Sequence, residues 1–155
     1  MSSSVLFVCL GNICRSPLAE AALRREADQR GLNLMVDSAG TGDWHVGKPP
    51  DHRAVAVARK NGVDISPLRA RQVTPDDFQR FDHIVALDAE NLANLERMRP
   101  PGSVAELSLL LDHVEGREGE PVADPYHGAA SHFDMTWADV VAGAKGLAAR
   151  QEARP

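Results

Sequence analysis

The chain of 155 residues has few cysteines, few aromatic residues and no long apolar run. Its two cysteines, Cys9 and Cys14, lie close together, so they do not form the spaced set that staples an extracellular domain. The apolar run near the N-terminus is too short to span a bilayer and lacks the basic flank and cleavage site of a signal peptide. We therefore expect no membrane insertion and a cytoplasmic location.

The chain also lacks an excess of basic residues. Its net charge is −5 at pH 7, and it has no basic tract or basic stripe interleaved with aromatic residues, which argues against general nucleic-acid binding. The six histidines show no metal-ligand spacing, and the two cysteines form no recognisable zinc pattern. We expect no metal and no cofactor.

The length of 155 residues suits one domain with a proper core, and we expect residues 1–155 to form it. Short apolar runs alternate with longer helical patterns, which predicts an α/β fold. Their nearly continuous apolar character favours an open parallel sheet of about four strands, flavodoxin-like, with helices on both faces. The expected strands are Val5–Cys9, Leu34–Ser38, His83–Leu87 and Val104–Leu107.

Start and stop residues bound the expected helices. Gly31 and Gly62 end the first two, Thr74 opens the third, and prolines follow the fourth. The last helix places apolar residues on one stripe. The expected helices are Pro17–Arg30, Asp51–Asn61, one opened by Thr74 to Asp77, Ala89–Met98, and one carrying Trp137, Val140, Val141, Ala144, Leu147 and Ala148.

The most informative segment is the loop between the first strand and the first helix, Cys9-Leu10-Gly11-Asn12-Ile13-Cys14-Arg15-Ser16. Ser16 followed by Pro17 predicts a helix that begins with a hydroxyl N-cap. The free N–H groups and dipole of a helix N-terminus attract a phosphate-sized anion, and the Arg15 guanidinium can grip two of its oxygens. The same positive field favours the thiolate form of Cys9, so the segment indicates an anion site with a nucleophile at its base.

The expected topology offers an independent test. Ligands of open parallel sheets bind outside the carboxyl ends of the strands. Cys9, Ser38 and Asp88 fall at the carboxyl ends of the first three expected strands, and Asp124 lies in the loop after the fourth. The pattern therefore predicts one crevice that contains all four, although Asp88 fits a helix N-cap as well as a substrate loop.

The loop resembles the phosphate-binding loop of the low-molecular-weight protein tyrosine phosphatases, which commonly reads Cys-x-Gly-Asn-x-Cys-Arg-Ser-Pro. Residues 9–17 match every fixed position of that pattern. A second signature of the family, Asp-Pro-Tyr, stands here as Asp124-Pro125-Tyr126. Smaller resemblances follow in the same order and extend the likeness over essentially the whole chain: Asp37-Ser38-Ala39-Gly40, Asp43-Trp44, Ala70-Arg71-Gln72 and Phe81-Asp82.

The resemblance implies the roles of the catalytic residues. Cys9 would attack phosphorus, Arg15 would clamp the phosphate, and Asp124 would act as general acid and base. Taken alone, Asp124 would be a solvated turn residue and Cys9 a small buried side chain at a strand end. The implied activity is hydrolysis of phosphotyrosine on proteins.

The resemblance also implies a substrate-binding set. Ser16 would hydrogen-bond the thiolate, and Asn12 would hold the loop together with Ser38. Because this loop-rich chain has only two Trp and one Tyr, we also expect Trp44 and Tyr126 to line the mouth of the pocket and flank a substrate ring rather than sit in the core. The complete predicted set is Leu10, Gly11, Asn12, Ile13, Cys14, Ser16, Ser38, Trp44 and Tyr126.

Cys14 has a second predicted role. A loop that curls around one anion brings the two thiols near each other, so Cys14 would close a reversible disulfide with oxidised Cys9. The alternative is that Cys14 merely packs behind the loop.

Two positions depart from the family pattern. Leu68 stands where many members have a histidine that supports the loop asparagine, which puts that network in question. His127 stands where many have a second aromatic residue after the Asp-Pro-Tyr motif, which questions phosphorylation control by paired tyrosines.

Two other functions remain open. Arsenate reductase uses the same loop but relays a disulfide through later cysteines, and none follows Cys14. A non-catalytic phosphate-binding interaction module is the other alternative. The partners expected for the phosphatase are phosphotyrosine-containing proteins, inorganic phosphate as product, and a cognate tyrosine kinase.

Overall fold

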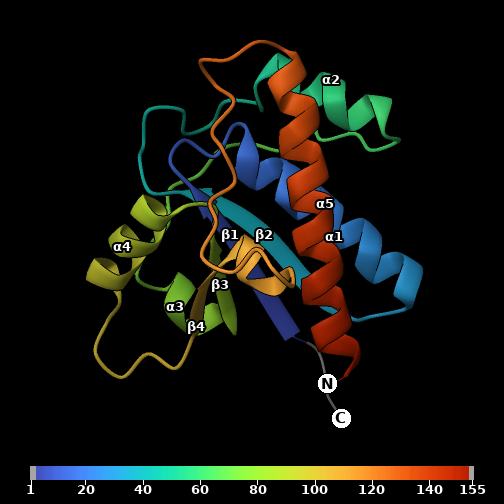
Figure 1. Ribbon diagram of the computed structural model, residues 1–155. Coiled ribbons are helices and arrows are strands. Elements are labelled where there is room, and N and C mark those ends of the chain that lie inside the picture. The colour runs from blue at the N-terminus through green and yellow to red at the C-terminus, as the bar shows by residue number, and fades with distance from the viewer. Residues whose placement is uncertain (1–2, 154–155) are drawn as a thin grey trace.

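The computed structural model describes residues 3–153, which form a four-stranded parallel sheet flanked by helices (Figure 1). The strand order is β2-β1-β3-β4, with every neighbouring pair parallel. This arrangement confirms the predicted fold class. The strands are β1 Ser3–Cys9, β2 Leu34–Gly40, β3 His83–Ala86 and β4 Glu106–Leu109.

Helices cover both faces of the sheet. Figure 1 shows α1 and α5 side by side on one face, with α2 near them, while α3 and α4 lie on the other. A short 3₁₀ helix, η1, follows β4 and contacts α5. The bounds are α1 Arg15–Arg30, α2 His52–Lys60, α3 Asp77–Arg80, α4 Ala89–Met98, η1 Leu110–His113 and α5 Ser131–Glu152.

Strand β1 runs through the middle of the sheet and joins two apolar cores. Successive side chains of a strand point to opposite faces. Accordingly, Val5 and Phe7 pack into the cluster under α1, α2 and α5, and Leu6 and Val8 into the cluster under α3 and α4. All four are fully buried. The strand that ends at Cys9 is therefore packed on both faces.

Several predicted boundaries differ from the observed ones by a few residues, and two of these differences have a clear structural cause. The fourth strand begins at Glu106 rather than Val104, because Arg99 donates hydrogen bonds to the carbonyl groups of Ser103 and Ala105 and so holds this segment in a local turn. Val104 itself is 93% exposed. Sheet pairing can begin only after these carbonyl groups.

Ser16 is not the N-cap of α1. The helix begins at Arg15 with Cys14 in the cap position, and no side chain caps it. The Ser16 hydroxyl is instead engaged by Asn12 and Cys9. The requirements of the loop thus outweigh the local capping preference.

Within residues 3–153, no helix has both the length and the apolar character needed to cross a bilayer.

Candidate active site

Cys9 ends β1 and lies at the base of a pocket with only 3% of its surface exposed. Its Sγ lies 3.3 Å from the backbone nitrogen of Asn12, which donates to it, and 3.0 Å from Ser16 Oγ. Ser16 Oγ already accepts a hydrogen bond of 2.8 Å from Asn12 Nδ2, so its own proton is available for the sulfur. Two hydrogen-bond donors therefore converge on Sγ.

Asn12 holds the loop in shape. Its φ of 58° lies in the left-handed region, which asparagine tolerates better than most residues. Its side-chain nitrogen donates to Ser38 Oγ at 3.0 Å, and its oxygen accepts from the backbone N–H of Arg71 at 3.0 Å. The Asn12–Ser38 contact implied by the resemblance is present.

Gly40 lets β2 approach this loop closely. A Cβ atom at Gly40 would lie 2.7 Å from the carbonyl oxygen of Leu10, too close for any side chain without a backbone shift. The Gly40 backbone also pairs with residues 71–73. The end of β2 thus supports the phosphate loop from behind.

Glu20 completes the support of the loop. Its Oε1 accepts a hydrogen bond of 2.7 Å from Ser38 Oγ, and Arg24 lies 2.8 Å from its Oε2. Burial raises the pKa of the Glu20 carboxyl, although Ser38 and Arg24 partly oppose the shift. Leu68 packs against the adjacent apolar core. The asparagine network is therefore present without a histidine at position 68.

Arg15 lies buried beside the pocket, with Nη1 donating to Asp88 Oδ2 and to the carbonyl oxygen of Val122, both at 2.8 Å. Its Nη2 lies 3.7 Å from Asp124 Oδ2. Asp88 also caps α4 by accepting from the N–H of Asn91, so the carboxylate serves both as a cap and as a site contact. These contacts fix the guanidinium between two carboxylates at the base of the pocket.

Asp124 stands at the side of the pocket, and its side chain is 46% exposed. Its Oδ1 accepts from the N–H of Tyr126, which orients the carboxyl group. Trp44 is 66% exposed and Tyr126 is 38% exposed, and both line the pocket. They are therefore rim aromatics and not core residues.

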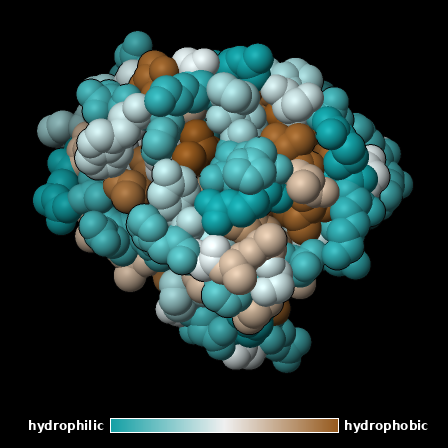
Figure 2. All heavy atoms as spheres, turned by 90° about the horizontal axis from the view of Figure 1, so that it is seen from above, coloured by the Kyte–Doolittle hydropathy of each residue, from teal (hydrophilic) through white to brown (hydrophobic). Residues whose placement is uncertain are grey.

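The pocket has a volume of about 170 Å³. It brings together most of the predicted site. Asn12, Ser16 and Ser38 do not line it but hold the loop in shape by hydrogen bonds, and Asp88, which was predicted to share the crevice, contacts it only through Arg15. Figure 2 looks down on this end of the sheet and shows small apolar patches separated by polar surface. The lining residues are Cys9, Leu10, Gly11, Ile13, Cys14, Arg15, Trp44, His45, Asp124, Tyr126 and His127.

Sequence reasoning missed several contributors, among them Glu20, His45 and the carbonyl of Val122. His45 lines the pocket beside Trp44, and its ring centroid lies 6.4 Å from that of Tyr126. Its position directly after Trp44 in the sequence could have identified it as a pocket residue. The carbonyl of Val122 carried no signal, because a backbone acceptor can occur at any residue type.

Cys14 lines the same pocket as Cys9. Burial, reinforced by the nearby Asp51 carboxylate, raises the pKa of the Cys14 thiol far above its usual range. Cys14 therefore remains a neutral thiol at physiological pH.

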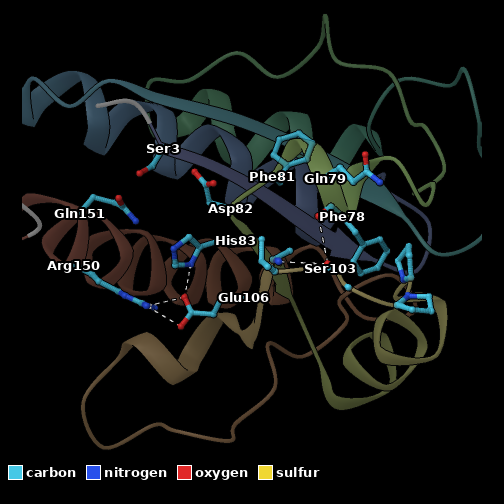
Figure 3. Close-up of a pocket in the computed structure, with 15 residues that line it drawn as sticks. Ser3, Phe78, Gln79, Phe81, Asp82, His83, Ser103, Glu106, Arg150 and Gln151 are labelled. Carbon is cyan, nitrogen blue, oxygen red and sulfur yellow. Dashed lines mark hydrogen bonds and ion pairs between the residues drawn. The ribbon is translucent and has the colours of Figure 1, made fainter.

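A larger cavity of about 910 Å³ lies at the other end of the sheet, where β1, β3 and β4 begin (Figure 3). There Glu106 lies 2.8 Å from His83 Nδ1 and 2.7 Å from Arg150 Nη2. The hydroxyl of Ser103 donates to the carbonyl of Phe78. This cavity has no cysteine, so the cysteine chemistry belongs to the carboxyl end of the sheet.

Across residues 3–153, no three His, Cys, Asp or Glu side chains are grouped so that they could hold a metal ion.

The geometry defines a class of protein: a parallel α/β protein in which a strand-to-helix loop surrounds a cysteine thiol, with an arginine and a carboxyl group beside it. A family model described as low molecular weight phosphotyrosine protein phosphatase matches residues 4–154. The chain belongs to this family.

Individual relatives agree with this assignment. A low molecular weight phosphotyrosine protein phosphatase of Schizosaccharomyces pombe is 44% identical over 140 residues, which cover 88% of this chain and 89% of the relative. The crystal structure of YfkJ from Bacillus subtilis has a TM-score of 0.90 at 39% identity, covering 99% of this chain and 98% of that one. The crystal structure of a Drosophila arginine phosphatase has a TM-score of 0.91 at 31% identity, covering 97% and 99%.

Proposed function

We propose that this protein hydrolyses phosphotyrosine on proteins through a phosphocysteine intermediate. The observation that carries the proposal is the convergence of the Asn12 N–H and the Ser16 hydroxyl on Cys9 Sγ, at the base of a pocket that also holds Arg15 and Asp124. A cysteine nucleophile with hydrogen-bond donors on its sulfur, a fixed cation and a carboxyl group are the groups that phosphoryl transfer by this route requires.

In the first step, Cys9 Sγ attacks phosphorus in line with the phenolic oxygen. The bond from phosphorus to that oxygen breaks, the Asp124 carboxyl gives its proton to the leaving phenol, and an S–P bond forms. Arg15 and the backbone N–H groups of the loop stabilise the negative charge on the equatorial oxygens.

In the second step, water attacks the phosphorus of phosphocysteine. The Asp124 carboxylate accepts a proton from the water, the S–P bond breaks, and the Cys9 thiolate and inorganic phosphate are released. The enzyme returns to its starting state, so no external reductant is needed. An arsenate reductase needs one, and the chain has no cysteine after Cys14 to relay its electrons.

The walls of the pocket favour an aryl group. Leu10, Ile13, Trp44 and Tyr126 present apolar and aromatic surface, on which a phenyl ring stacks well. One similar structure is named an arginine phosphatase, so phosphoarginine is the substrate to compare. The cationic guanidinium of phosphoarginine would need a carboxylate partner. Asp124 is the carboxylate that lines this pocket, but it is protonated in the first step. A neutral phenyl ring needs no charge partner.

Substrate comparison tests this function. The wild type should hydrolyse p-nitrophenyl phosphate and phosphotyrosine peptides, with inhibition by vanadate, and should act on phosphoarginine peptides more slowly. Cys9→Ser should lose turnover but still bind vanadate, because Arg15 and the loop remain. Faster hydrolysis of phosphoarginine would reassign the substrate, and phosphate binding without turnover in the wild type would indicate the non-catalytic interaction module.

The acid role of Asp124 has its own test. Asp124→Asn should lower kcat/KM for tyrosine phosphate by ~10²-fold, and lower it much less for p-nitrophenyl phosphate, whose leaving group needs less protonation. Steady-state kinetics on both substrates measure the difference. An equal loss on both would mean that Asp124 only supports the loop.

We further propose that residues 1–155 act as one catalytic domain in the cytoplasm. Cys9 must stay reduced to attack phosphorus, and a reducing compartment keeps it so. A tyrosine kinase that supplies the phosphorylated substrate is the expected partner.

A further inference from the structure

Arg53, in the first turn of α2, contacts the segment that carries the proposed general acid. We call residues 122–130 the acid loop. Arg53 Nη2 donates a hydrogen bond of 2.8 Å to the carbonyl oxygen of Tyr126, and Nη1 donates one of 3.1 Å to that of Gly128. Both acceptors are backbone groups shortly after Asp124, so one guanidinium holds the main chain on the C-terminal side of the acid.

Other anchors of this part of the loop are few. Val122 is bound to Leu87 and to Arg15. From residue 123 to residue 130, the remaining hydrogen bonds of the acid loop stay within the loop or join it to the start of α5. Among the residues that the structure describes, Arg53 thus supplies the hydrogen bonds that join residues 123–130 to the body of the protein, and the ion pair of 3.7 Å between Arg15 Nη2 and Asp124 Oδ2 is a further contact.

Asp51 sets the orientation of Arg53. Its Oδ1 lies 3.0 Å from Arg53 Nε and its Oδ2 lies 3.0 Å from Nη2, so the pair is bidentate. Burial alone would raise the pKa of Asp51, but the hydrogen bonds and charge of Arg53 outweigh it and lower that pKa. The guanidinium also lies over the ring of Phe133, 4.7 Å from its centroid. Arg53 is therefore held on two sides.

The same unit reaches the phosphate loop. The backbone N–H of Asp51 donates to the carbonyl oxygen of Ile13 at 2.8 Å. A continuous path of contacts thus runs from Ile13 through Asp51 and Arg53 to Tyr126 and Gly128. It connects the loop that holds the nucleophile to the loop that holds the acid.

We propose that Arg53 is a positioning residue for the general acid, setting the place of Asp124 relative to Cys9. The inference rests on the proposed function. General acid catalysis requires hydrogen-bond reach between the acid and the leaving oxygen, and a displacement of about 1 Å can cost ~10²-fold in rate. Arg53 touches neither Cys9 nor Asp124, so its effect would pass through the backbone of the acid loop.

The test uses Arg53→Met, which keeps the length of the stem and removes the donors. We expect kcat/KM for phenyl phosphate, a substrate with a poor leaving group, to fall by about 10-fold or more. For p-nitrophenyl phosphate the loss should be less than about threefold. The inhibition constant of inorganic phosphate should hardly change, because the phosphate loop keeps its own contacts.

A double variant separates positioning from folding. In an Asp124→Asn background, Arg53→Met should cause almost no further loss, since the acid is already absent. Arg59→Met is the matched control, because Arg59 lies in the same helix and pairs with Asp64 on the surface. Arg53→Lys keeps the charge without the fork, and should lie between the wild type and Arg53→Met.

Certain results would overturn the inference: equal losses for the two leaving groups, or a full additional loss in the Asp124→Asn background. If Arg53→Met does not fold, the same comparisons on Arg53→Lys decide. Failure of the proposed function would look different, because the wild type itself would then not hydrolyse either aryl phosphate.

Discussion

Asn12 and Ser16, the polar side chains next to Cys9, each form hydrogen bonds with at least two partners. Asn12 contacts Ser16, Ser38 and the backbone of Arg71, and Ser16 contacts both Asn12 and Cys9. Buried polar groups that are fully paired specify one arrangement, while a partly paired set costs free energy. The loop is therefore organised before any phosphate arrives, which suits electrostatic stabilisation of a transition state.

The two cysteines provide a prediction at this scale. Peroxide should oxidise Cys9 to a sulfenic acid, and the Cys14 thiol should then attack that sulfur and release water to form a disulfide. Because the raised pKa of Cys14 keeps its thiol neutral, the closing step should speed up as the pH increases. The treated protein should lose activity and two hydrogen atoms of mass, with a peptide linking Cys9 to Cys14, and dithiothreitol should restore it.

Cys14→Ser is the comparison for this redox prediction. Under the same peroxide treatment it should lose activity irreversibly, because nothing captures the sulfenic acid before further oxidation. If the variant recovers as fully as the wild type, Cys14 only packs against the loop.

At the scale of the elements, α5 packs closely against its neighbours on one face of the sheet. Helix α5 contacts α1, α2 and η1. A Cβ at Gly146 would lie 1.9 Å from the carbonyl oxygen of His113, and one at Gly143 would lie 2.4 Å from Leu110 Cγ. Two glycines thus let η1 lie directly on the helix.

Gly146→Ala tests this packing. In an ordinary helix the change stabilises by up to about 1 kcal/mol, but here the backbone of η1 must move, so we expect a loss of about 1–3 kcal/mol in the free energy of unfolding. Urea denaturation measures it, with the exposed Lys145→Ala as a control of small effect. A variant more stable than the wild type would show that η1 shifts without cost.

At the scale of the whole molecule, the sheet separates two ends of different chemistry. The carboxyl ends of the strands carry the thiol, the arginine and the acid, whereas their amino ends carry the ion pairs of Glu106 with His83 and Arg150. Glu20 belongs to α1, and its buried side chain accepts a hydrogen bond from Ser38 of β2. Its charge therefore affects the stability of the entire protein.

Stability should depend on pH through Glu20. Because burial raises its pKa in the folded state, the folded protein binds more protons than the unfolded chain above the unfolded pKa of about 4.3. This contribution to stability is present below that pH and is lost as the pH rises through the folded pKa of Glu20. Glu20→Gln has no carboxyl group to titrate at this position. Its free energy of unfolding should therefore not show the fall with rising pH that Glu20 causes in the wild type.

Urea denaturation across the acidic to neutral range measures this dependence. The exposed Glu90→Gln should follow the pH profile of the wild type. A Glu20→Gln profile parallel to that of the wild type would mean that Glu20 titrates alike in both states.

The sequence alone determined the parallel α/β fold, most element boundaries and the identity of the reactive groups. Alternating apolar runs, helix-ending glycines and the loop from Cys9 to Ser16 are local patterns, and each carries its own physical meaning. The helix Ala89–Met98 was predicted at its observed bounds for this reason. The N-cap assigned to Ser16 was wrong because a contact from outside the helix competed for the hydroxyl.

Only the tertiary structure decided how those groups are held. Arg15 donates to the carbonyl of Val122, which lies 107 positions away in the sequence, and Ser38 donates to Glu20. Arg53 donates to the carbonyls of Tyr126 and Gly128. Backbone acceptors and lone charged residues leave no pattern along a chain, since any residue type can supply a carbonyl group. Their partners are chosen by which segments the packed sheet and helices bring together.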